Sequence, residues 1–167
     1  MKNSGLTMIE IMFYLAISAI IFLASFFVVN FINQVKVKNQ AVAEVEYQGN
    51  IIMDKMLQSV RTSQGVNTPI VGASDTSLSI SMSDSSKNPT VYSFSGNNIT
   101  IKEGASSTTN LGNSNIAFSS GTFTNDSASA DYDSIKVSFT ITYVNPSGKS
   151  EYNYSRTFYG TASTRKK

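Results

Sequence analysis

The sequence predicts an α+β protein in which one long N-terminal helix packs against a C-terminal antiparallel β-sheet. Residues 11–29 carry no charge and contain neither Pro nor Gly, so they can form an unbroken apolar helix. Apolar residues then recur every three or four positions as far as Val60, which is the period of a helix with one buried face. After Pro69 the period changes to two, which is typical of strands.

The first element, expected at residues 6–32, has the length and composition of a transmembrane helix. As a helix, residues 11–29 span about 30 Å, the thickness of a bilayer's hydrocarbon core. A secretory signal peptide would be shorter and would end in a small-x-small cleavage site, which "VVNFINQVKVKNQ" does not offer. Lysines flank the run on both sides and give little orientation, but the polar, Ser- and Thr-rich body favours an external C-terminal domain.

The helix is expected to continue through residues 33–62 with an amphipathic pattern. Gly49 fills a gap in its apolar stripe, and "RTSQGVNTP" (61–69) is expected to end it. The apolar stripe is defined by Val42, Val45, Ile52, Met56 and Val60. It is widened by Ile51, Met53 and Leu57.

The β-domain is expected at residues 63–160, followed by a basic tail at 161–167. "LSISM" (78–82) alternates, and "TVYSFSGNNITIKEG" (90–104) predicts a hairpin around Gly96. "NIAFSSGTFTN" (115–125) predicts a strand broken at Gly121. The longest hairpin is expected from two stretches. In "DSIKVSFTITYV" one face is lined by Ile135, Val137, Phe139, Ile141 and Tyr143, and in "EYNYSRTFYG" polar residues alternate with Tyr152, Tyr154, Arg156 and Phe158.

Composition argues against catalysis, and we expect no enzyme and no cofactor. The chain has no Cys and no His, which removes the commonest nucleophile–base pairs and zinc ligands. "SGKSE" (147–151) offers Ser and Lys but is typical of a hairpin turn. A loop with several oxygen ligands is a weak calcium candidate without EF-hand spacing, and a solvated acidic loop is the simpler interpretation of Asn125, Asp126, Asp131 and Asp133.

The C-terminal aromatic residues and the basic tail do not predict a nucleic-acid partner. Alternation on paired strands favours cross-strand packing over base stacking. The net charge of +2 is too small to require an acidic partner.

Glu10 is the residue that a plain membrane anchor does not explain. A carboxylate in the apolar core costs about 2.5–3.5 kcal/mol on insertion scales, and it usually has a partner. Lys2 is separated from it by Asn3, Ser4 and Gly5, which are poor helix formers. A positive charge supplied from elsewhere is therefore expected to pair with Glu10.

The stretch "SGLTMIE" followed by a long apolar helix resembles the amino terminus of type IV prepilins and type II secretion pseudopilins. The resemblance covers about the first 30 residues. It implies that residues 1–5 are a leader peptide, that a prepilin peptidase/methyltransferase cuts between Gly5 and Leu6, and that Leu6 is then N-methylated. Glu10 becomes the fifth mature residue and is expected to meet the Leu6 ammonium of a neighbouring subunit during assembly.

The chain departs from the family pattern at two points, of which the second favours a minor pilin or pseudopilin, and the order of long helix, hairpins and late strand "KVSFTITYV" resembles the tip-associated minor pseudopilins. Leu6 stands where Phe is usual, and the apolar run lacks the Pro of many major pilins. The resemblance implies other pilin or pseudopilin subunits, an inner-membrane assembly platform and membrane lipid as partners. It also implies a single pass through the cytoplasmic membrane, N-terminus inside, before incorporation into a cell-surface or periplasmic filament. The alternative is a single-pass anchored extracytoplasmic binding protein that never assembles.

Overall fold

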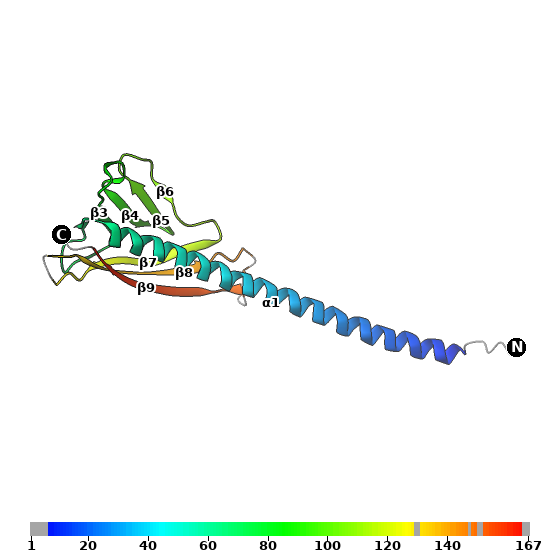
Figure 1. The fold of residues 1–167 in the computed structure, drawn as a ribbon. Helices are drawn as coiled ribbons and strands as arrows, with labels where there is room; N and C mark the ends of the chain where they lie inside the picture. The colour runs from blue at the N-terminus through cyan, green and yellow to red at the C-terminus, as the bar shows by residue number, and fades with distance from the viewer. Residues whose placement is uncertain (1–6, 129–130, 147, 150–151, 165–167) are drawn as a thin grey trace. The chain divides into compact units, whose positions relative to one another are not determined.

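The computed structural model describes residues 7–128, 131–146, 148–149 and 152–164. The chain divides into two compact units, Met1–Asn39 and Gln40–Lys167. One helix, α1 (Met8–Thr62), begins in the first unit and ends in the second, and all described strands follow it in the second unit (Figure 1). The chain is therefore α+β, as the sequence predicts, with the helix packed against antiparallel sheets.

The part of α1 that belongs to the second unit buries one stripe of side chains. The stripe confirms the predicted period, with two corrections: Val42 is only half-buried, and Ile51 is exposed, because the stripe turns toward Met53 and Leu57 instead. The buried residues of α1 are Ala41, Val45, Gly49, Ile52, Met53, Met56, Leu57 and Val60. The helix ends at Thr62, where the Ser63 hydroxyl donates to the Val60 carbonyl oxygen at 2.7 Å.

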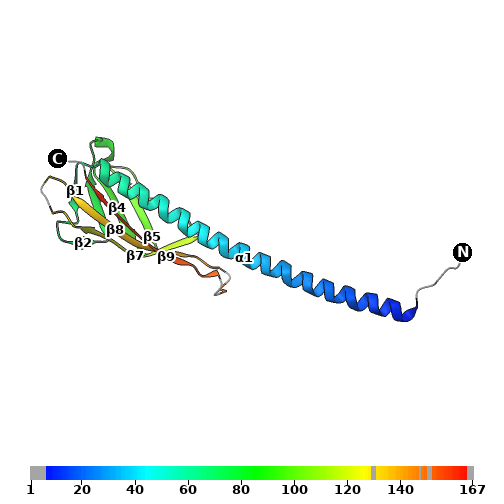
Figure 2. The same cartoon turned by 60° about the horizontal axis from the view of Figure 1, so that its bottom comes forward.

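The first sheet has five antiparallel strands in the order β1-β3-β4-β5-β6. Figure 2 labels β1, β4 and β5 of this sheet. A short 3-10 helix, η1 (Ser85–Lys87), precedes β4. The predicted hairpin around Gly96 is confirmed: Gly96 and Asn97 form a two-residue turn, and Gly96 has a φ of 58°, which suits glycine. The strands are β1 (Gly65–Thr68), β3 (Ser77–Ser81), β4 (Thr90–Ser95), β5 (Asn98–Glu103) and β6 (Thr109–Asn110).

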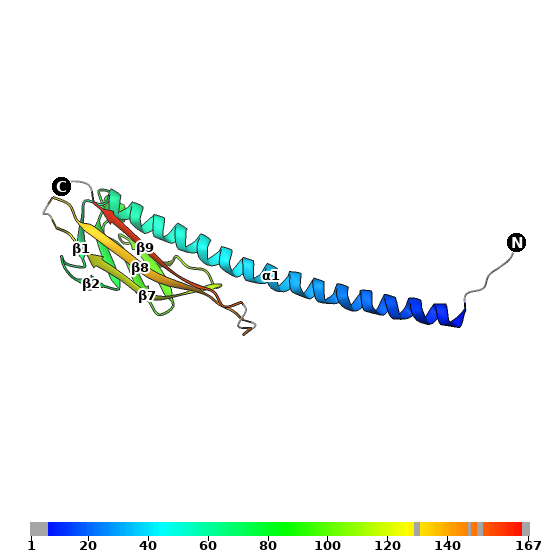
Figure 3. The ribbon, with the colours of Figure 1, turned by 90° about the horizontal axis from the view of Figure 1, so that it is seen from below.

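The second sheet has four antiparallel strands in the order β2-β7-β8-β9 (Figure 3). The break expected at Gly121 is a bulge inside one continuous strand, since the register shifts between Ser119 and Thr122 and Ser120 has a φ of 52°. The strands are β2 (Ser74–Asp75), β7 (Ile116–Asn125), β8 (Ser134–Tyr143) and β9 (Ser155–Ser163).

The sheet arrangement differs from the prediction of a single sheet. β1 lies inside the stretch expected only to end the helix, and β2 and β6 are two-residue strands with no readable alternation. β9 starts at Ser155, later than its aromatic pattern indicates, and it continues three residues beyond the boundary expected at residue 160. Arg165, Lys166 and Lys167 lie outside the described residues.

One hydrophobic core joins the second-unit part of α1 to both sheets. Phe139 on β8 is at its centre: its ring lies 5.9 Å from that of Phe94 on β4, 5.8 Å from that of Phe118, and 5.5 Å from that of Phe158 on β9. Phe158 in turn packs directly on the α1 backbone at Gly49. Aromatic contacts thus tie the two sheets and the helix into one body.

Candidate functional site

The first unit presents an apolar helical surface with no protein cover. Every residue of α1 from Met8 to Val35 is exposed, and the segment is long and apolar enough to cross a membrane. Its polar side chains bond to the helix's own carbonyl oxygens: Ser18 to Leu15 at 3.0 Å and Ser25 to Ile21 at 2.8 Å. Asn30 donates to the Phe26 carbonyl oxygen in the same way, at 2.8 Å. Such internal bonds lower the cost of placing these groups in hydrocarbon.

Glu10 lies in the first turn of α1 and closes a capping box with Thr7. The backbone N–H of Thr7 donates to Glu10 Oε2 at 2.8 Å, and the Thr7 hydroxyl donates to the same oxygen at 2.9 Å. The Glu10 N–H donates back to Thr7 Oγ1 at 3.4 Å. This reciprocal pattern satisfies donors that a helix N-terminus leaves open.

The capping box gives Glu10 a role inside its own chain that the sequence reasoning above did not include. The signal was present, because "TMIE" is the T-x-x-E spacing immediately before an apolar run. Thr7 brings no positive charge, however, and Oε1 of Glu10 accepts no bond from the described residues. Gly5 and Leu6, the expected cleavage and methylation residues, lie outside the described part of the chain.

The weak calcium candidates on the loop after β7 serve mainly to hold loops together. Asn125 is buried: its Nδ2 donates to the Pro69 carbonyl oxygen at 2.8 Å, and its Oδ1 accepts the Ser127 N–H at 3.2 Å. Buried Asp133 accepts the Val66 N–H at 2.8 Å. Among the described residues no three acidic side chains converge as a metal site would require. Asp126 and Asp131 are exposed.

A cluster around Glu46 fastens α1 to the start of β9. The Tyr154 hydroxyl donates to Glu46 Oε1 at 2.8 Å, and Arg156 donates to Glu46 Oε2 in an ion pair. The bonds from Arg156 and then Tyr154 lower the pKa of Glu46 below its ordinary 4.5, while the bond to Glu46 raises the pKa of Tyr154. The exposed Arg156 guanidinium also lies 5.3 Å from the Phe158 ring centre, so it covers the outer side of that ring.

The predicted packing role of the C-terminal aromatic residues is confirmed for most of them. Tyr152 and Phe158 are buried, and Tyr143 and Tyr154 pack against the core. Tyr159 is the exception, with 70% of its surface exposed, because it points to the face of the second sheet opposite the core.

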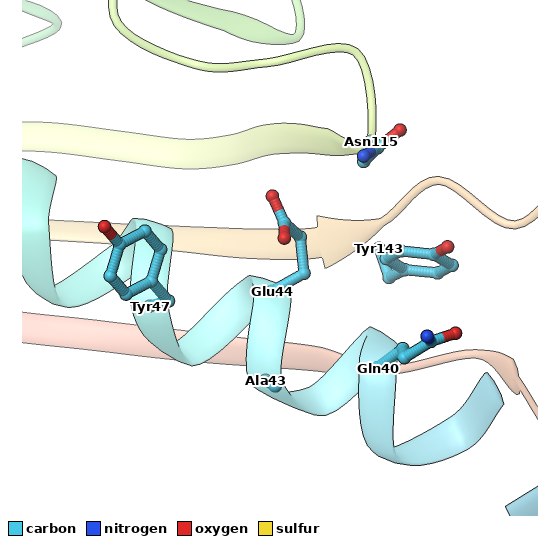
Figure 4. Close-up of a pocket in the computed structure, with 6 residues that line it drawn as sticks. All are labelled: Gln40, Ala43, Glu44, Tyr47, Asn115 and Tyr143. Carbon is cyan, nitrogen blue, oxygen red and sulfur yellow. The ribbon is translucent and has the colours of Figure 1, made fainter. Parts of the chain in front are cut away.

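A surface groove lies in the second unit between α1 and the ends of β7 and β8, and we name it the Glu44 groove. Its volume is about 550 Å³. Figure 4 shows the Glu44 carboxylate between the two tyrosine rings, with Asn115 across from it. The lining residues are Gln40, Ala43, Glu44, Tyr47, Asn115 and Tyr143. Sequence reasoning missed this groove because its walls come from three distant segments.

Comparison of the chain with models of known families, with characterised proteins and with solved structures finds no match.

Proposed function

We propose that the chain is a structural subunit, minor or tip-associated, of a type IV pilus or a type II secretion pseudopilus. A prepilin peptidase/methyltransferase removes residues 1–5 and methylates Leu6. The chain sits once in the cytoplasmic membrane with its N-terminus inside. An inner-membrane assembly platform then moves it into a filament of pilin or pseudopilin subunits. The chain itself performs no catalysis.

The observation that carries the proposal is the fully exposed apolar length of α1 with a carboxylate in its first turn. Lipid can cover the apolar side chains of a monomer, and helices of neighbouring subunits can cover them in a filament. The lipid hydrocarbon that covers these side chains supplies no positive charge for Glu10. A neighbour's Leu6 ammonium can supply one, because methylation leaves its positive charge in place.

The capping box favours a second candidate, the single-pass anchored binding protein that does not assemble. In that protein Glu10 would only satisfy donors at the start of α1. The two functions differ in what they require of Glu10: capping needs an acceptor, whereas subunit pairing needs a negative charge.

Glu10→Gln separates these requirements, because Gln also closes a capping box but carries no charge. In cells with an active prepilin peptidase, Glu10→Gln should still be cleaved, since Gly5 and Leu6 are untouched. The amount of chain recovered in sheared filaments should fall sharply relative to wild type. Thr7→Val is the matched control: it removes the hydroxyl part of the cap, keeps the charge and should assemble. Equal recovery of wild type and Glu10→Gln in filaments would show that assembly does not need the charge of Glu10, whereas absence of wild type from filaments would favour the non-assembling anchor.

A further inference from the structure

β9 lies at one border of the second sheet and leaves a long edge without a neighbouring strand (Figure 3). The other terminal strands of the two sheets are short: β1 has four residues, and β2 and β6 have two each, whereas β9 has nine. Proteins commonly protect a long edge with Pro, Lys or a bulge. β9 contains neither Pro nor Lys, and its register with β8 is continuous from Ser155 to Ser163. The edge is therefore long, regular and unprotected.

The hydrogen bonds at both ends of the β8–β9 pair show which backbone groups point out of this edge. The Tyr143 N–H donates to the Tyr154 carbonyl oxygen at 2.8 Å. The Thr164 N–H donates to the Asp133 carbonyl oxygen at the same distance. In an antiparallel pair, residues bonded to the partner strand alternate with residues whose N–H and C=O point away from it. The even-numbered residues of β9 therefore bond to β8, and the odd-numbered residues point outward, namely Ser155, Thr157, Tyr159, Thr161 and Ser163.

These outward groups have no cover from the described part of the chain. Within residues 7–128, 131–146, 148–149 and 152–164, no backbone–backbone hydrogen bond from another segment reaches them. All five outward residues are exposed. α1 contacts β9 through the residues between them: Arg156 bonds to Glu46, and Phe158 packs at Gly49. The helix thus lies over one face of β9 and leaves its edge open.

A second copy of the chain is a poor partner for this edge. β9 runs in the same direction as the second-unit part of α1, because Arg156 meets Glu46 near the start of the strand. Further along, Gly160 lies against Met53. Antiparallel pairing of two β9 edges about a two-fold axis would therefore turn the α1 helices of the two copies in opposite directions. Chains inserted in one membrane with the same orientation cannot meet in that way.

The side chains beside the edge indicate what kind of strand fits it. The outward-facing residues of β9 carry hydroxyl groups and the exposed Tyr159 ring, which pair well with hydroxyl, β-branched or aromatic side chains. Lys136 is the one charged residue on this face of β8 and β9; it is exposed, lies opposite Thr161, and belongs to neither ion pair of the described residues. A strand added to β9 would lie about 10 Å from β8, so an acidic side chain next to Thr161 could meet the Lys136 ammonium.

We infer that the edge of β9 accepts an extended strand of a different filament subunit, with an acidic residue next to Thr161. The inference rests on the proposed function, because a minor or tip-associated position gives the chain neighbours other than its own copies. The backbone groups of the five outward residues supply the hydrogen bonds of the contact. The hydroxyl groups, Tyr159 and Lys136 select the partner strand.

Amide hydrogen exchange of the full-length chain tests the inference. In the detergent-solubilised chain, the outward N–H groups of Thr157, Tyr159 and Thr161 should exchange almost without protection. Those of Phe158 and Gly160, which bond to β8, should exchange slowly. In sheared filaments the three outward amides should slow by about tenfold or more.

The outcomes of the exchange experiment are distinct. Outward amides that exchange equally fast in filaments would overturn the inference and leave the proposed function standing. A detergent-solubilised chain that is already dimeric, with these amides protected, would assign the edge to a second copy and also overturn it. If wild type enters no filament, the proposed function and the inference are both overturned.

Two variants of one residue separate the backbone contact from the side chain. Thr157→Pro and Thr157→Val both lose the hydroxyl that lies 2.9 Å from the Thr140 hydroxyl, but only Pro also removes the outward N–H. Recovery of Thr157→Pro in sheared filaments should fall by about fivefold or more, while Thr157→Val should stay near wild type. Lys136→Glu should also lower recovery, and Lys136→Arg should not. Equal recovery of the Pro and Val variants would overturn the inference; if Thr157→Pro fails to fold, the exchange of the wild-type amides decides.

Discussion

Gly49→Ala probes how closely α1 approaches β9. A Cβ added at Gly49 would lie 2.5 Å from Cε1 of Phe158 and closer still to Cζ and Cε2 of the same ring. Ordinary carbon–carbon contacts are about 3.5–4.0 Å, so the ring or the helix must move by about 1 Å or more. The ring has little freedom, because it stacks on Phe139 at 5.5 Å and lies beneath the Arg156 guanidinium.

The expected change in stability is the difference between two opposing effects. Overpacking a filled core costs about 1–3 kcal/mol. Replacing a helical Gly with Ala returns about 0.8–1.0 kcal/mol of helix propensity. Because the Phe158 ring is held on two sides, we expect the cost near its upper range and a net loss of about 1–2 kcal/mol. For a domain of this size that lowers Tm by roughly 3–10 °C.

Thermal unfolding of the detergent-solubilised chain, followed by circular dichroism, measures the effect. Asn50→Ala is the matched control: it changes the next residue of the same helix, at an exposed position, and should leave Tm unchanged or slightly raised. Phe158→Leu should cost stability alone but less in the Gly49→Ala background, because the smaller side chain relieves the overlap. A Gly49→Ala chain at least as stable as wild type would refute the close approach of helix and strand.

Three further predictions concern the second unit. Glu46→Gln should lower the stability of the fold modestly at pH 7. Because folding depresses the pKa of Glu46, its stabilising contribution is fully present above pH 4.5 and is lost as the pH falls through the folded-state pKa. Plots of Tm against pH for wild type and variant should therefore converge in acid, and parallel plots would contradict the pairing of Glu46 with Arg156 and Tyr154. Asn125→Ala should cost about 1–3 kcal/mol in urea unfolding, since the buried Pro69 carbonyl oxygen loses its donor, whereas Ser119→Ala on the exposed face should be neutral. A fragment starting at Gln40 should be soluble and give a mixed helix and strand circular dichroism spectrum; a disordered spectrum would show that the second unit needs the first.

The elements with a long, regular period could be predicted from the sequence. The buried stripe of α1 and the alternating residues of β4, β5 and β8 each repeat often enough to fix both type and face. β1, β2 and β6 are too short to repeat, and their pairing depends on strands elsewhere in the chain. The division of the strands into two sheets could therefore not be predicted from the sequence, and neither could the Glu44 groove.

The role of Glu10 at the start of α1 was only partly predictable from the sequence. The cost of an apolar-flanked carboxylate drew attention to Glu10, but its nearest partner, Thr7, is a neutral residue three positions away. Looking for a positively charged partner of Glu10 in the sequence therefore overlooked Thr7. The capping spacing gives the helix-terminus role of Glu10, while a role for its charge needs a partner outside the described residues.

The mass of the mature chain tests the central proposal most directly. The membrane-extracted protein from a cell with an active prepilin peptidase should have an intact mass equal to residues 6–167 plus one methyl group on the Leu6 amine. Gly5→Leu should abolish the cleavage, because a bulky side chain then precedes the cut. A wild-type chain that still begins at Met1 in that cell would contradict the processing, and with it the proposal that this chain is a filament subunit.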